Sequence, residues 1–171
     1  MTLLELLTVL MIIGILAVLL LPTIGWYRNR AYHIGCVQNL KSLYVATTNY
    51  MASSGGRWPQ IRLAKDQSVK YAEEWHDVLH PYGIGWENLV CPMVQSRIGN
   101  PDVSKPKEHR TDYIAMHFSD NPNAAMKWPL QPWFVERQDS HGSGGLMILT
   151  NSQIIDLQEA AKMAKQPQQV E

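Results

Sequence analysis

The sequence predicts a mixed α+β chain in which one long N-terminal helix packs on a small, loop-rich head with an antiparallel β-sheet. Three observations predict this fold class: an apolar and then amphipathic helical pattern to about residue 53, a change of composition after it, and short apolar runs between turn residues near the C-terminus. At 171 residues the chain has room for one domain and one extended element.

The charge balance restricts the function. Lys plus Arg and Asp plus Glu each number 15, so the formal net charge is zero. This argues against a protein that binds nucleic acid or anionic lipid by bulk charge. The two cysteines, Cys36 and Cys91, do not have the close spacing of a metal motif.

Residues 1–27 form the first predicted segment. It opens with MTLLELLTVLMIIGILAVLLLP, and no charged residue occurs from Leu6 to Tyr27. These residues would span about 33 Å as a helix, enough to cross a bilayer. A secretory signal peptide is a poorer explanation, because no basic residue precedes the run and no small-x-small cleavage site follows it. We expect a basic leader to have been removed before residue 1.

Glu5 is the one acidic residue in this segment. A carboxylate at the edge of an apolar run costs several kcal/mol in lipid or in a packed core unless it is paired. The cation that is always available to pair with Glu5 is an N-terminal amine, either that of the same subunit or that of a neighbouring subunit. A pair between subunits would fix their register, and Thr2 could add a hydrogen bond there.

Residues 28–54 are predicted to continue the helix as an amphipathic segment. Apolar residues recur at steps of three and four, which gives one stripe: Ile34, Val37, Leu40, Tyr44, Thr47 and Met51. SSGGRWP ends the helix.

Gly14 and Pro22 weaken the first half of the long helix, because glycine lowers helix stability by about 1 kcal/mol relative to alanine and proline removes a backbone hydrogen bond.

Residues 55–157 are predicted to form the globular head. YAEEWHDVLHPYG suggests a short helix ended by Pro81, TDYIAMHF a strand, and PWFVER a weaker strand. GLMILTNSQIIDL is the best hairpin, turning at Thr150–Ser152. Residues 158–171 are expected to be a polar tail with one or two helical turns.

The N-terminal segment resembles the mature amino terminus of type IV pilins and of the pseudopilins of type II secretion. The matching positions are Met1 (where Phe is commoner), Thr2, Glu5, Gly14 and Pro22. The resemblance implies cleavage and N-methylation by a prepilin peptidase, an inner-membrane assembly platform and an assembly ATPase. It implies a homo-oligomeric helical filament, with the subunit in the inner membrane before assembly and at the cell surface afterwards. In such filaments the helix between Gly14 and Pro22 opens; a simple proline kink is the alternative.

The head is similar, more loosely, to pseudopilin-like proteins of planctomycetes and verrucomicrobia. The similarity lies in CVQNL, EEWHDVLHPYG, LVCP and DSHGSGGLMILTNSQIIDL, although the usual Asp-Gly turn is Thr-Asn-Ser here. It implies a disulfide between Cys36 and Cys91 that ties the long helix to the head. Closing a loop of 54 intervening residues would contribute about 4 kcal/mol. Two buried free thiols are the alternative.

Other sites are weaker. His76 and His80 have the spacing of a helical metal pair but lack a third ligand. Asp120, Asn121 and Asn123 could bind calcium, although a turn of these residue types needs no metal. No catalytic arrangement is found, and no enzyme, nor any firm cofactor, is expected.

From the resemblance we expect a major pilin-like subunit. The alternatives are a minor pseudopilin of a secretion piston and a membrane-tethered head that binds carbohydrate through tryptophans.

Overall fold

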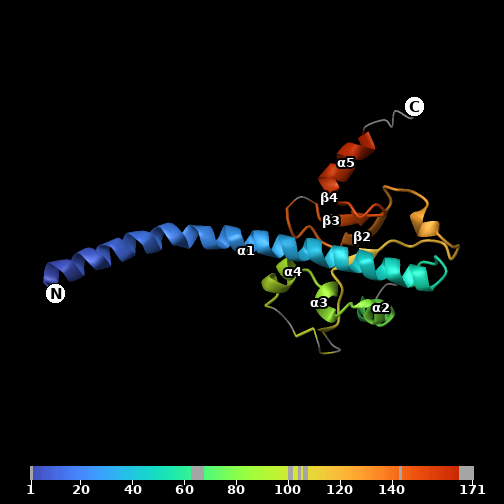
Figure 1. The fold of residues 1–171 in the computed structure, drawn as a ribbon, viewed down its shortest axis with the longest axis horizontal. Helices are drawn as coiled ribbons and strands as arrows, with labels where there is room; N and C mark the ends of the chain where they lie inside the picture. Colours follow the sequence, from blue (N-terminus) through green and yellow to red (C-terminus); the bar gives the residue numbers. More distant parts are fainter. Residues whose placement is uncertain are drawn as a thin grey trace.

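The structure is a computed structural model of residues 1–171. The structure describes residues 2–62, 68–99, 102, 103, 105, 108–142 and 144–165, with the backbone alone at 18–24 and 26. The chain is mixed α+β, as predicted, with helix α1 (Leu3–Ser53) at its N-terminal end and a four-stranded sheet. Figure 1 shows that the first half of α1 extends far beyond the rest of the molecule.

Short elements follow α1 and form the head. The helices are α2 (Ser68–Leu79), η1 (His80–Tyr82), α3 (Trp86–Leu89), α4 (Pro92–Arg97), η3 (Ala124–Met126) and α5 (Leu157–Lys165). The strands are β1 (Tyr113–Ala115), β2 (Pro132–Glu136), β3 (Leu146–Leu149) and β4 (Ile154–Asp156). The predicted strands and hairpin are confirmed: the sheet has the order β1-β2-β3-β4, and every neighbouring pair is antiparallel.

The second half of α1 runs between α2–α4 on one side and the sheet on the other (Figure 1). Its buried face includes Cys36, Leu40, Leu43, Thr47 and Met51. The predicted stripe was wrong at its start, because Ile34 is 56% exposed. The head contacts α1 from two sides, so the buried face is wider than one stripe.

Strand β3 is buried at all four positions because both of its faces are covered. Leu146 and Ile148 belong to the main core, whereas Met147 and Leu149 face a smaller cluster that includes Ala160 of α5. This is why LMIL lacks the apolar–polar alternation of a half-exposed strand. The predicted polar tail is helical through Lys165, and 166–171 lie outside the described residues.

The core of the head contains a cluster of aromatic rings. Trp58 is 1% exposed, and its ring centroid lies 4.7 Å from that of Phe118 and 5.1 Å from that of Trp133. Tyr44 of α1 stacks on Trp133 at 4.7 Å, which joins the long helix to β2. Stacked and edge-on rings at such distances add to the free energy gained by burying their area.

Candidate functional site

The N-terminal end of α1 carries an exposed apolar surface. The large apolar side chains between Leu3 and Leu16 are 47–84% exposed and occur on every side of the helix. A contiguous apolar surface of this extent marks a site that contacts protein or lipid. Of the residues predicted to act here, Gly14 has open space where a Cβ would lie, whereas Met1 and the side chain of Pro22 lie outside the described residues.

Glu5 forms a capping box with Thr2 at the start of α1. The Thr2 backbone N–H donates to Glu5 Oε2 at 2.9 Å, and the Glu5 N–H donates to Thr2 Oγ1 at 3.4 Å. The box satisfies backbone donors that the first turn of a helix leaves unpaired. This role was not predicted, although Thr-x-x-Glu before an apolar run is the signature of a capping box. The predicted pairing of Glu5 with the amine of Met1 concerns a residue outside the described ones.

In the parts of the chain that the structure describes, no helix combines the length and the apolar character that a membrane span requires. The predicted span includes 18–24 and 26, whose side chains are outside the described residues.

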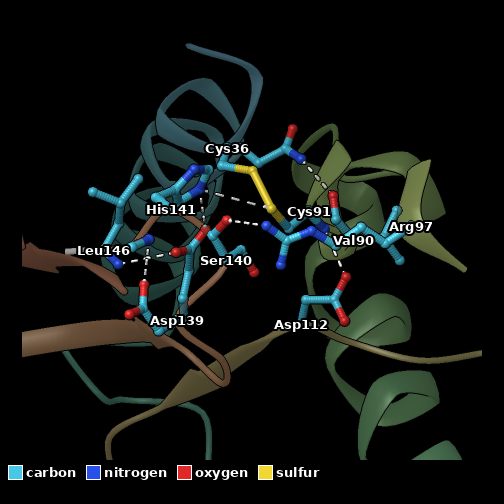
Figure 2. Close-up of polar contacts among 12 residues, drawn as sticks. Cys36, Val90, Cys91, Arg97, Asp112, Asp139, Ser140, His141 and Leu146 are labelled. Carbon is cyan, nitrogen blue, oxygen red and sulfur yellow. Dashed lines mark hydrogen bonds and ion pairs between the residues drawn. A yellow bond between two sulfur atoms is a disulfide. The ribbon is translucent and has the colours of Figure 1, made fainter. Parts of the chain in front are cut away.

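A second candidate site lies where α1 meets the head. The disulfide between Cys36 and Cys91 is present, and it joins α1 to the residue before α4 with Cα atoms 5.2 Å apart. Figure 2 shows the polar contacts around it. Asn39, one turn beyond Cys36, donates through Nδ2 to the carbonyls of Val90 (2.8 Å) and Glu87 (3.2 Å). The Cys91 N–H donates to Asp112 Oδ2 at 2.8 Å. Both sides of the disulfide are thereby held in position.

The hydrogen bonds of the Asn39 side chain should stabilise the contact between α1 and the head. Asn39→Ala should lower the free energy of unfolding by about 1–3 kcal/mol, because it leaves the buried Val90 carbonyl without its donor. Urea unfolding of the full chain in detergent micelles measures this. The matched control is Gln38→Ala at the adjacent exposed position, which should change stability by less than about 0.5 kcal/mol. Equal effects of the two substitutions would contradict the role given to Asn39.

Two ionisable side chains, for which no role was predicted, lie beside the disulfide. His141 Nε2 lies 3.2 Å from Glu136 Oε1 and 3.9 Å from Cys91 Sγ. The exposed fractions of the two side chains are 3% for His141 and 1% for Glu136. Glu136 Oε2 accepts a 3.0 Å hydrogen bond from the Leu146 N–H. The four Cys, Glu and His ligand atoms all lie within 4.8 Å of one another.

The loop that carries His141 is held by Asp139. The Gly142 N–H donates to Asp139 Oδ1 at 2.7 Å. Hydrogen bonds from backbone amides, that of Gly144 foremost, hold the pKa of the Asp139 carboxyl below its ordinary value. His33 of α1 lies edge-on to His141, with ring centroids 4.8 Å apart. Burial, and then the neighbouring His141, lower the pKa of the His33 imidazole.

Two of the three calcium candidates, Asp120 and Asn123, have protein partners in the described contacts. The Asp120 carboxylate pairs with Arg57 at 3.7 Å. Asn123 has a φ of 59° and donates its N–H to the Gly56 carbonyl at 2.8 Å. A Cβ on Gly56 would lie 2.6 Å from Asn123 Oδ1, so this junction between the end of α1 and the loop requires glycine. Asn121 and Asn123 line the same hollow beside this junction.

His76 and His80 belong to a stack of rings. Their centroids are 4.9 Å apart, and His76 lies 4.1 Å from Trp86 with the two planes nearly parallel. Trp86 is covered on its other side by His109 at 3.8 Å, and His109 Nδ1 lies 3.0 Å from Glu73 Oε1. The histidine spacing therefore places rings in a stack that joins α2 to α3.

In comparisons with known proteins, no family model, no curated protein and no solved structure matches this chain.

Proposed function

We propose that the chain is a structural subunit of a type IV pilus-like filament and that its N-terminal helix holds the subunits together. The observation that carries the proposal is the first part of α1, which leaves the head with exposed apolar side chains on every side and with one carboxylate, Glu5, near its end. The resemblance of Met1, Thr2, Glu5, Gly14 and Pro22 to the pilin amino terminus supports it. A minor pseudopilin would share these features, in a shorter filament.

Assembly in this proposal buries the exposed surface of α1 against other copies of α1. Burial is favourable by about 25 cal/mol for each Å² of apolar surface removed from water. Before assembly the same surface rests in the inner membrane, and a prepilin peptidase, an assembly platform and an assembly ATPase act on the subunit. The filament then stands outside the cell.

Glu5 has two roles in this proposal. In the isolated subunit it caps α1 through Thr2. In the filament its negative charge pairs with the methylated, positively charged terminal amine of a neighbouring subunit, which sets the axial register. The two roles make different demands: a cap requires an acceptor oxygen, which glutamine also provides, whereas an ion pair requires the charge.

Glu5→Gln tests the proposal. It should keep the cap and lower the yield of filaments sheared from the producing cells by at least about tenfold, because the loss of one charged hydrogen bond per contact costs about 1.5–3 kcal/mol. Immunoblotting of whole cells checks that the subunit is made. The mass of the N-terminal peptide from wild-type filaments should equal that of a chain beginning at Met1 with one added methyl group.

Thr2→Ala is the matched control. It removes the Oγ1 acceptor of the cap, at a cost of about 1 kcal/mol to the first turn, and leaves the Glu5 charge in place. Filament yield should fall clearly less than in Glu5→Gln, because Thr2 contributes one neutral hydrogen bond, in the cap or to a neighbouring subunit, and no charge. Normal filaments from Glu5→Gln together with a loss of filaments from Thr2→Ala would mean that Glu5 serves only as a helix cap. The tethered carbohydrate-binding head would then be the better explanation.

A further inference from the structure

We propose that reduction of the Cys36–Cys91 disulfide creates a buried zinc site formed by Cys36, Cys91, His141 and Glu136. The inference is independent of the filament proposal. It rests on the convergence of four ligand-type side chains at the contact between α1, the residue before α4, the end of β2 and the loop before β3 (Figure 2).

Two of the distances between the ligand atoms are close to those of a tetrahedral site. Zinc binds thiolate sulfur at about 2.3 Å and nitrogen or oxygen at about 2.0–2.2 Å, so its ligand atoms lie about 3.3–3.8 Å apart. Here His141 Nε2 is 3.9 Å from Cys91 Sγ and 3.2 Å from Glu136 Oε1. All four ligand atoms lie within 4.8 Å of one another, and reduction lets the two sulfur atoms separate by breaking the bond between them.

The chemistry balances with a dithiol as the reductant. The dithiol gives two electrons and two protons to the S–S bond, which yields two cysteine thiols and the cyclic disulfide of the reductant. Binding of Zn²⁺ then displaces one proton from each thiol, and these two protons leave to solvent. His141 binds as the neutral tautomer with its hydrogen on Nδ1, so that Nε2 offers a lone pair to the metal.

The surroundings suit a zinc ion better than a hard cation. Two sulfurs, one imidazole nitrogen and one carboxylate oxygen match zinc, whereas calcium and magnesium require oxygen ligands. The Leu146 N–H holds the second Glu136 oxygen, as outer hydrogen bonds do for metal ligands. Two thiolates and a carboxylate leave one net negative charge with Zn²⁺, and Arg97, bonded to the Ser140 carbonyl at 3.0 Å, places a positive charge beside the site.

Cobalt(II) binding tests the site on the full chain in detergent micelles. The chain is reduced with a dithiol, freed of reductant under inert gas and titrated with Co²⁺ alone. We expect one equivalent to give the intense visible d–d bands of tetrahedral cobalt together with a thiolate charge-transfer band, and Zn²⁺ to remove both. The oxidised chain should give neither, because disulfide sulfurs are not thiolates.

Substitutions of the proposed ligands test whether Glu136 and His141 bind the metal. Glu136→Gln and His141→Asn, each reduced, should weaken Co²⁺ binding at least tenfold. The matched control is His117→Asn, at an exposed histidine away from the site, which should bind as wild type does. Unchanged binding in both ligand variants, or no tetrahedral spectrum from the reduced wild type, overturns the proposal.

If reduction unfolds the head, circular dichroism can measure whether zinc refolds it. If the metal-free reduced chain is unfolded, one equivalent of Zn²⁺ should restore the spectrum of the oxidised chain, because a ligand that binds only the folded state stabilises it. If Zn²⁺ restores neither the spectrum nor the melting transition, the proposal is wrong.

Discussion

Replacing Cys36 and Cys91 together with alanine should lower the free energy of unfolding by about 4 kcal/mol. The two residues are 55 apart in sequence, and a cross-link that closes a loop of that length restricts the unfolded chain by this amount in the chain-entropy model. Both cysteines are at most 1% exposed, so the lost sulfur contacts add to the effect. Urea unfolding of the full chain in detergent micelles measures it.

The wild-type chain under reducing conditions is the matched comparison. With a metal chelator present, so that no zinc replaces the cross-link, reduction should destabilise the chain by a similar amount. Mass analysis after alkylation without reductant should find no alkylated cysteine. Two alkylated cysteines in that experiment, or a loss of less than about 1 kcal/mol in the double variant, would contradict a stabilising disulfide.

Trp58→Ala should destabilise the head by about 3–5 kcal/mol, the usual range when a buried tryptophan is truncated. The Trp58 ring lies among those of Phe118, Trp133 and Phe134, at 4.7–5.8 Å between centroids. No single neighbour can move into the space it leaves without losing its own contacts. The change in denaturant midpoint, with the slope of the transition unchanged, measures the loss.

Trp128→Ala is the matched control for Trp58, since the residue type and the substitution are the same. Trp128 is 60% exposed, and its ring centroid lies 5.3 Å from Lys127 Nζ. Its truncation should change stability by less than about 0.5 kcal/mol. Similar losses in the two variants would show that the aromatic cluster around Trp58 is not the main source of the stability of the head.

Local patterns in the sequence were enough to predict α1, α2 and the four strands, whereas the short helices α3, α4 and η3 were not predicted. The helical pattern of α1 ends at SSGGRWP, and α1 ends at Ser53. The hairpin of β3 and β4 turns between Leu149 and Ile154 as the turn residues indicate, with Ser152 at a φ of 66°. These features depend on residues a few positions apart, so propensity, periodicity and turn chemistry determine them.

The contacts between distant segments could not be predicted in this way. Glu136 and His141 belong to a strand and to a glycine-rich loop, and only the fold brings them beside a disulfide whose two halves come from α1 and the segment before α4. Ile34 fits the apolar stripe but is exposed, and the periodicity alone could not show which part of the stripe the head covers.

The sequence by itself therefore determined the long helix, the strands and the hairpin, since hydrogen-bonded turns and side-chain periodicity are local properties. Tertiary structure alone decided which faces are covered and which ionisable groups meet. Those outcomes depend on how separate elements pack, and packing is set by the shape and burial of many side chains at once. The buried cluster beside Cys91 is the clearest product of that packing.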